Sequence, residues 1–205
     1  MSKLYLLLAL LLSSLSIAAE LYTVKYVAWE VSLAAKNAKI MSVQAGEKGK
    51  GFQPITQFIN EISKQVMEGT SNITDAALSL SKVSVKEQRS ADAYRRFSLV
   101  MNKDKEARHI KSLSPAMAQV KKSRQLAITD FKKSLYNLTQ LLEDMDQCML
   151  SARAIASVSR IVTSDAGEYR DKLNVVANDL DESAKYIKEK LLVSYKHLND
   201  AVRAN

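Results

Sequence analysis

Apolar residues recur along most of this chain at alternating spacings of three and four, the pattern of a helix that buries one narrow stripe. The most regular stretch runs from Ile128 to Ala156 and holds for four heptads without interruption. Such spacing is typical of a coiled-coil seam, in which each apolar side chain packs between residues of a facing helix. This seam consists of Ile128, Phe131, Leu135, Leu138, Leu142, Met145, Met149, Ala152 and Ala156.

The same spacing predicts three further helices, so that the expected helices span about 4–45, 52–105, 115–163 and 168–203. A glycine-rich break at 46–51, a boundary at 109–115 and the short segment TSDAGE separate them. Ser112 and Ser114 are the expected caps of the third helix, with Pro115 in its first turn. The three seams are Ile17, Leu21, Val24, Ala28, Val31, Ala35 and Ala38; Phe52, Ile55, Ile59, Ile62, Val66, Ile73 and Leu80; and Leu173, Val176, Leu180, Ala184, Ile187, Leu191 and Leu198.

Long helices without strands are also what the composition favours, because the chain holds only 5 Gly and 2 Pro in 205 residues. Short connections force neighbouring helices to run antiparallel. We therefore predict an all-α fold, an antiparallel four-helix coiled-coil bundle made of two long helical hairpins. The first hairpin covers residues 1–108 and the second covers residues 109–205.

The two hairpins match each other at an offset of 121 positions without a gap. This offset sets Ala45-Gly46-Glu47 on Ala166-Gly167-Glu168, and it keeps the apolar seams in phase on both sides of the turn. Two readings stay open: an internal duplication, or the similarity that any two heptad hairpins share.

The start of the chain also has two readings. Residues 4–12 read LYLLLALLL after Lys3, and small residues follow, as in a signal peptide that is cleaved to remove residues 1–19. The heptad spacing of the first helix, however, passes through this cleavage region without a change of phase. We favour the start of a packed helix and keep an exported helical bundle as the alternative.

The first turn carries the run NAKIMSVQAGEKGKGF, from Asn37 to Phe52. This run resembles the signalling tip of bacterial methyl-accepting chemotaxis receptors, whose pattern is close to NAAIEAARAGExGRGF, and the resemblance covers about Trp29 to Ser63. In that family the segment ends a long antiparallel helical hairpin, which implies the same fold here. It also implies a hairpin turn at Gly46, Gly49 and Gly51.

In the family, this tip holds receptors together and engages a coupling protein and a histidine kinase. The resemblance therefore implies a chemotaxis-type signalling or scaffold role, with such a protein, a receptor or a second copy of the chain as partner. Met41 and Gln44 depart from the family, which has Glu and Arg there. The implied partner-binding residues are Trp29, Asn37, Met41, Gln44 and Glu47.

A second resemblance, to the modification sites of the same receptors, rests on Glu87 and Gln88 with their small neighbours. These two residues are candidates for modification. The alternative reading of the same segment is an exposed helix face.

Residues with catalytic chemistry do not form a recognisable set in this sequence. A single cysteine, Cys148, excludes an intramolecular disulfide, and we expect a buried, inert thiol. His109 and His197 lie in different segments without other ligands at metal-binding spacing. We predict that the protein is not an enzyme and has neither a metal site nor a cofactor.

The net charge of +8 is compatible with an anionic partner. We interpret the Lys and Arg residues as scattered through the helices and alternating with Asp and Glu. We therefore predict no nucleic-acid binding and leave membrane contact open. The expected location is the cytoplasm, with membrane association as an option and export as the alternative.

Overall fold

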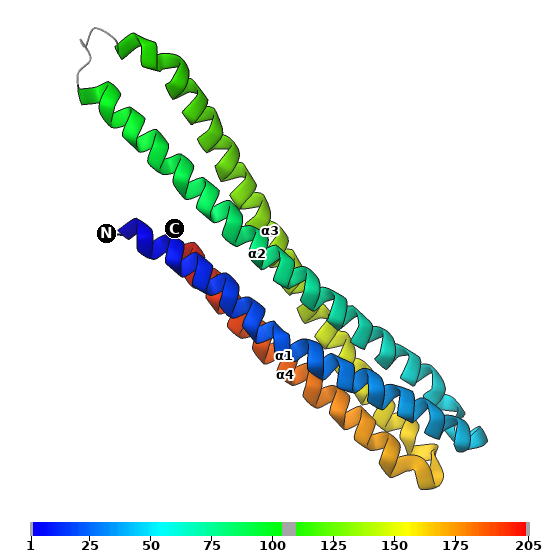
Figure 1. The fold of residues 1–205 in the computed structure, drawn as a ribbon. Helices are drawn as coiled ribbons and strands as arrows, with labels where there is room; N and C mark the ends of the chain where they lie inside the picture. The colour runs from blue at the N-terminus through cyan, green and yellow to red at the C-terminus, as the bar shows by residue number, and fades with distance from the viewer. Residues whose placement is uncertain (1, 104–109, 204–205) are drawn as a thin grey trace.

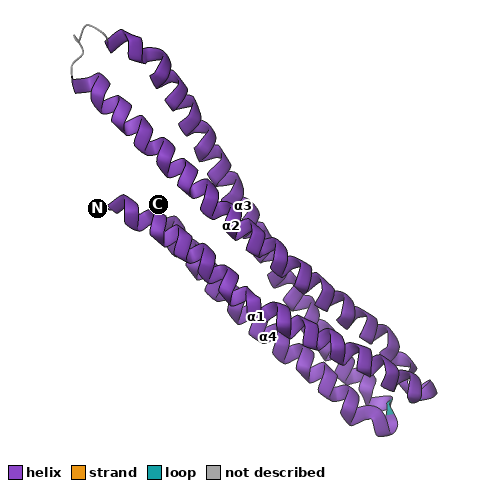
Figure 2. Ribbon diagram, viewed as in Figure 1, coloured by secondary structure: helices purple, strands orange, loops and turns teal. Residues whose placement is uncertain are grey.

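The computed structural model describes the backbone of residues 2–103 and 110–203, and the side chains of 12–103, 112–164 and 166–200. These residues form helices and contain no strand (Figure 2). The predicted all-helical class, with four long helices, is confirmed. They are α1 (Ser2–Gln44), α2 (Gln53–Lys103), α3 (Ser114–Val162) and α4 (Arg170–Arg203).

Short 3-10 helices lie at the connections between the long helices. η1 (Gly46–Phe52) joins α1 to α2, η2 (Ile110–Leu113) precedes α3, and η3 (Thr163–Asp165) and η4 (Gly167–Tyr169) join α3 to α4. Pro115 lies in the first turn of α3 as predicted. The predicted serine cap is wrong, because the N-cap residue of α3 is Leu113 and it makes no side-chain capping bond. The 3-10 turn that precedes α3 can satisfy its first amides instead.

The four long helices form a bundle-like arrangement in which each has two neighbours. α1 contacts α2 and α4, and α3 contacts the same two helices. Figure 1 shows the turn η1 and the turn η3–η4 at one end of the molecule, which we call the tip end. The start of α1 and the end of α4 point to the opposite end, and α2 and α3 continue past both of them (Figure 1).

The core follows the predicted seams. All the seam residues predicted for α1, α2 and α4 are buried, and seven of the nine predicted for α3 are buried as well. The exceptions are Ile128 and Leu135, which are half-buried. They flank the buried Phe131, and Leu135 packs against the core from its edge.

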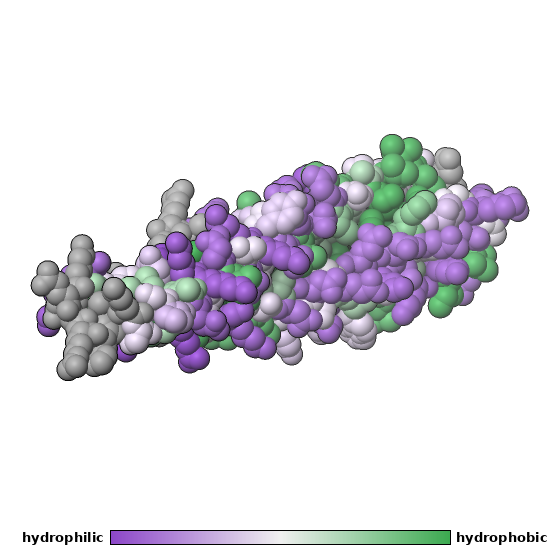
Figure 3. Space-filling model, turned by 90° about the horizontal axis from the view of Figure 1, so that it is seen from above, coloured by the Kyte–Doolittle hydropathy of each residue, from purple (hydrophilic) through white to green (hydrophobic). Residues whose placement is uncertain are grey.

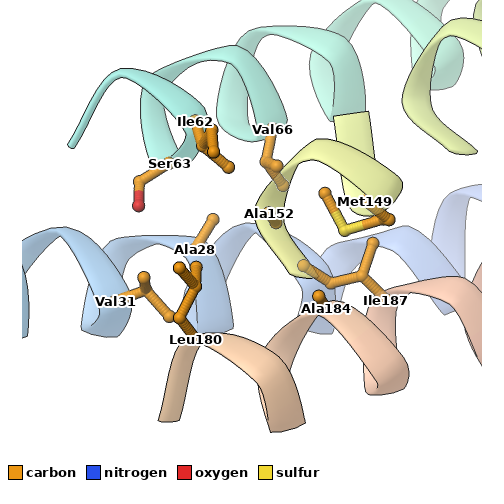
Figure 4. A pocket seen from close by; sticks show the side chains of 10 residues that line it. All are labelled: Ala28, Val31, Ile62, Ser63, Val66, Met149, Ala152, Leu180, Ala184 and Ile187. Carbon is orange, nitrogen blue, oxygen red and sulfur yellow. The ribbon is translucent and has the colours of Figure 1, made fainter. Parts of the chain in front are cut away.

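Packing along the middle of the core is close. A void of about 10 Å³ remains between the four helices, lined by apolar side chains and Ser63, which Figure 4 shows converging from all sides. Such a space holds at most about one water molecule. The lining residues are Ala28, Val31, Ile62, Ser63, Val66, Met149, Ala152, Leu180, Ala184 and Ile187.

The offset of 121 also relates buried positions and polar contacts of the helix pair α1–α2 to those of the pair α3–α4. Buried Leu21 corresponds to buried Leu142, and buried Ile59 to buried Leu180. Polar contacts correspond too. The Ser32 hydroxyl on α1 donates to Asn60 on α2 over 2.9 Å. At the equivalent positions, Arg153 on α3 donates to Asp181 on α4 over 3.2 Å. The helix pairs α1–α2 and α3–α4 therefore bury equivalent positions.

Over the described residues, no helix is both long enough and apolar enough to cross a lipid bilayer. The division into two hairpin domains at residue 108 stays a prediction.

Candidate partner-binding tip

Each tip is turned by one glycine in the left-handed region. Gly46 and Gly167 both have a φ of 59°, and they are equivalent under the offset of 121. An L-residue with a side chain is disfavoured in this conformation by about 1–2 kcal/mol. The Ala-Gly-Glu identity of the two tips therefore has a backbone reason.

Gly49 is required for a different reason. It is buried, and a Cβ atom at this position would overlap the carbonyl oxygen of Ser42 at the end of α1. The absence of a side chain lets η1 fold back against α1. All three predicted turn glycines, Gly46, Gly49 and Gly51, lie in η1.

The first tip packs against the second. A Cβ atom built on Gly51 would lie 3.1 Å from Cγ1 of Val162, and one built on Gly167 would lie 3.3 Å from Cδ of Lys48. η1 also contacts η3 directly. The two turns thus form one continuous end surface, which the sequence alone did not predict.

The five predicted partner-binding residues lie on α1 and η1. Asn37 and Gln44 are exposed on α1, and Glu47 is exposed on η1, with 88% of its side chain accessible. Met41 is half-buried and packs on the core. Trp29 is 52% exposed but lies eight residues before Asn37, about 12 Å along the helix. The structure therefore places Asn37, Gln44 and Glu47 near the tip and Trp29 further along the same helix.

Charge at the tip is balanced locally. Lys50 Nζ lies 3.3 Å from Glu47 Oε1, and both side chains are largely exposed, so this pair contributes little to stability. Glu47 thus stays accessible to a cationic group of a partner.

Sequence inspection missed a second apolar stripe on α1, which faces away from the core. Its members follow the same three-and-four spacing as the buried seam, five residues further along the chain. Figure 3 shows apolar surface gathering on the half of the molecule that carries the tips. The exposed members of the stripe are Leu12, Leu15, Tyr22, Tyr26, Trp29, Leu33, Ile40 and Val43.

Trp29 belongs to an aromatic groove on this stripe. Its ring centroid lies 6.1 Å from that of Tyr26, and Tyr22, Met67 and Tyr186 line the same groove. A hydrogen bond to Glu30 raises the pKa of Tyr26, so its phenol stays protonated. The Tyr186 hydroxyl donates to Thr23 over 3.0 Å, so the groove offers mainly its aromatic rings, a residue type that is enriched at protein interfaces.

The remaining candidate residues lie outside the tip. Glu87 and Gln88 are half-buried in α2 rather than fully exposed, and the Gln88 amide nitrogen is buried without a hydrogen-bond partner among the described residues. Burial raises the pKa of the half-buried Cys148, which keeps its thiol protonated and weakly nucleophilic. His197 is half-buried, and His109 lies outside the described residues.

Metal ligands do not cluster in the described part of the chain, where no group of three or more His, Cys, Asp or Glu side chains could hold an ion. The class that the fold and the site define is an all-helical, bundle-like protein with an exposed, glycine-turned tip. Comparisons with protein-family models, with curated proteins and with solved structures gave no match for this chain.

Proposed function

We propose that the protein is a non-catalytic, chemoreceptor-like signalling or scaffold protein whose first tip docks a signalling partner. The observation that carries the proposal is the exposure of Asn37, Gln44 and Glu47 beside a glycine-determined turn. These residues belong to the segment that resembles the receptor tip, and they make little contact with the core. Their exposure leaves all three side chains available to a partner.

We infer further that the helices form an antiparallel four-helix coiled-coil bundle made of two hairpins. The cyclic order of helix contacts and the equivalent buried seams support this architecture. A receptor dimer reaches the same cross-section with two chains, each contributing one hairpin. Here, one chain carries both hairpins, and the second hairpin takes the place of the other subunit.

Retention of the first residues is part of the proposal, together with a cytoplasmic location. α1 is continuous from Ser2 to Gln44, and Ser14 and Ile17 are 4% and 1% exposed. Cleavage near Ala19 would remove both side chains from the core. We expect an intact mass that includes residue 1 or 2, whereas a mature chain that starts near Ala19 would support the exported alternative.

The docking role is tested by replacing Asn37, because the exposed amide contributes to partner binding and little to folding. Binding to a chemotaxis coupling protein is measured for the parent, for Asn37→Ala and for the matched control Asn137→Ala, an equally exposed asparagine on α3. We expect the Asn37 variant to lose at least about tenfold in affinity, the effect of a moderate interface residue, and the control to bind like the parent. Failure of the parent to bind the coupling protein or a histidine kinase would contradict the proposal.

A second experiment restores the charges of the receptor pattern. Met41→Glu with Gln44→Arg places opposite charges three residues apart on one helix face, where they can pair with each other or with a neighbouring chain. We expect the double variant to self-associate more strongly or to bind the coupling protein more tightly. No change in either assay would reduce the resemblance to shared hairpin geometry.

A further inference from the structure

The basic residues of this chain are concentrated in one segment, which corrects the interpretation that Lys and Arg are scattered evenly among Asp and Glu. Residues 82–133 hold 14 Lys and Arg against 5 Asp and Glu, a net charge of +9. The rest of the chain holds 16 basic and 17 acidic residues, a net charge of −1. One segment therefore carries all of the excess positive charge.

The described parts of this segment lie toward the end of the molecule opposite the tips. We call its described parts, residues 82–103 of α2 and 114–133 of α3, the basic arm. Figure 1 shows these two helices continuing beyond the ends of α1 and α4. No side chain is buried over 91–103 or over 112–126, so two helices alone cannot enclose a core there.

Positive charge on the arm is largely uncompensated. Lys86 pairs with Asp130 at 2.9 Å and Arg95 pairs with Asp92 at 3.3 Å, while Arg124 lies over the ring of Tyr94 at 4.7 Å. Three described carboxylates, however, face eleven described cations, and ten of these cations are exposed. The exposed cations are Lys82, Lys86, Arg89, Arg95, Arg96, Lys103, Lys121, Lys122, Lys132 and Lys133.

Apolar side chains accompany this charge. Leu99, Val100 and Leu126 are 64%, 54% and 55% exposed on the arm. A nucleic acid would match the charge but not the apolar residues, whereas a lipid surface with anionic headgroups matches both.

We propose that the basic arm binds the surface of an anionic membrane and that the tips point away from it. Lysine and arginine side chains engage the anionic headgroups, while the exposed leucine and valine side chains enter the boundary between headgroups and acyl chains. The proposal is independent of the partner that docks on the tip.

The test is co-sedimentation of the full chain with phosphatidylcholine vesicles, alone or with about one third phosphatidylserine. We expect binding to the anionic vesicles only, and release when NaCl rises from about 0.1 M to about 0.5 M. Absence of binding to the anionic vesicles would overturn the proposal, as would tighter binding to a DNA or RNA duplex than to those vesicles.

Matched charge reversals locate the surface. One variant changes four exposed cations of the arm to Glu (Arg96, Lys121, Lys122 and Lys132), and its control changes four exposed cations near the tips to Glu (Lys36, Lys39, Arg170 and Lys172). We expect the arm variant to lose at least about 100-fold in vesicle partitioning and the control to retain most of it. Equal losses in both variants would overturn the assignment to the arm, and circular dichroism confirms that each variant is folded.

The single tryptophan provides an independent readout. Trp29 lies on the outer stripe of α1 and outside the arm, so its emission should not change when vesicles bind. A shift of the emission to shorter wavelength would show that the α1 stripe, rather than the arm, enters the membrane, and would overturn the proposal.

Discussion

Two helices, α2 and α3, run through both the half of the molecule that carries the tips, called the tip half, and the basic arm. The two regions differ in how many other helices surround α2 and α3. In the tip half, each helix has two neighbours, and seam residues such as Ile59 and Leu142 are fully buried. On the arm, α2 and α3 extend past the ends of α1 and α4 (Figure 1), no side chain is buried over 91–103 or 114–126, and Leu99 and Leu126 are more than half exposed. Heptad spacing thus predicts a helix in both regions, whereas the number of neighbouring helices decides whether a core forms.

The largest expected effect on stability comes from the same substitution, Leu to Asp, made on α3 once in the core and once on the arm. Leu138→Asp places an unpaired carboxylate in the core, where the residue is 0% exposed, and should cost about 3–5 kcal/mol or prevent folding. Leu126→Asp, at a site that is 55% exposed on the arm, should cost less than about 0.5 kcal/mol. Thermal melts followed by circular dichroism measure both, and similar melting temperatures for the two variants would invalidate the comparison.

A smaller effect is expected at the tip turn. Gly46→Ala forces a side chain into a φ of 59° and should lower the free energy of unfolding by about 1–2 kcal/mol. Space is not the cause, because a Cβ atom at this position meets no other atom within 4 Å. Gly46→Asn is the control, since Asn tolerates this conformation better, and a control that loses as much as Gly46→Ala would refute the backbone explanation.

Asp181 stabilises the second hairpin through pH-dependent pairing. Hydrogen bonds from Lys185, Arg153 and Arg160 lower the pKa of its carboxyl from 3.8 to about 2. Because the pKa is lower in the folded state, this stabilisation is fully present above pH 3.8 and is lost as the pH falls toward 2.

Asp181→Asn should therefore cost about 1–2 kcal/mol at neutral pH, a modest value because the partner cations are partly exposed. The difference from the parent should shrink as the pH falls below 4, which denaturant titrations at a series of pH values measure. Asp75→Asn, at an exposed site on α2, serves as the control. A difference that does not depend on pH would argue against the ion-pair origin.

The smallest expected effect on stability lies at the docking surface. Asn37 is exposed on α1, so Asn37→Ala should change the free energy of unfolding by less than about 0.5 kcal/mol while it weakens partner binding. Denaturant titration beside the binding assay measures both quantities. A stability loss above about 1 kcal/mol would reassign Asn37 to a structural role.

Most of the fold was predictable because coiled-coil burial repeats along the chain. The seam through Leu138, Leu142 and Met145 predicted both a helix and its buried face. The half-burial of Ile128 and Leu135 was not predictable from spacing, because both follow the same three-and-four pattern as the buried Phe131 and Leu138.

The candidate site was predictable only in part. Glycine spacing indicated the turn, and the resemblance selected Asn37 and Gln44, which are exposed near the tip. The outer stripe of α1 was visible in the sequence as a second heptad pattern, but α1 is apolar on several faces, and only the packing shows which stripe is buried. Contact between the two tips joins residues more than 100 positions apart, such as Gly51 and Val162, which no local pattern reports.

We propose that a signalling protein docks at the tip end of the molecule and not on the arm. Hydrogen–deuterium exchange of the full chain, with and without a chemotaxis coupling protein, tests it most directly because it locates the contact along the sequence. We expect slower exchange from Trp29 through η1 when the partner is present, and unchanged exchange over residues 82–133. Protection confined to the arm, or no protection at the tip at a saturating concentration of the partner, would contradict it.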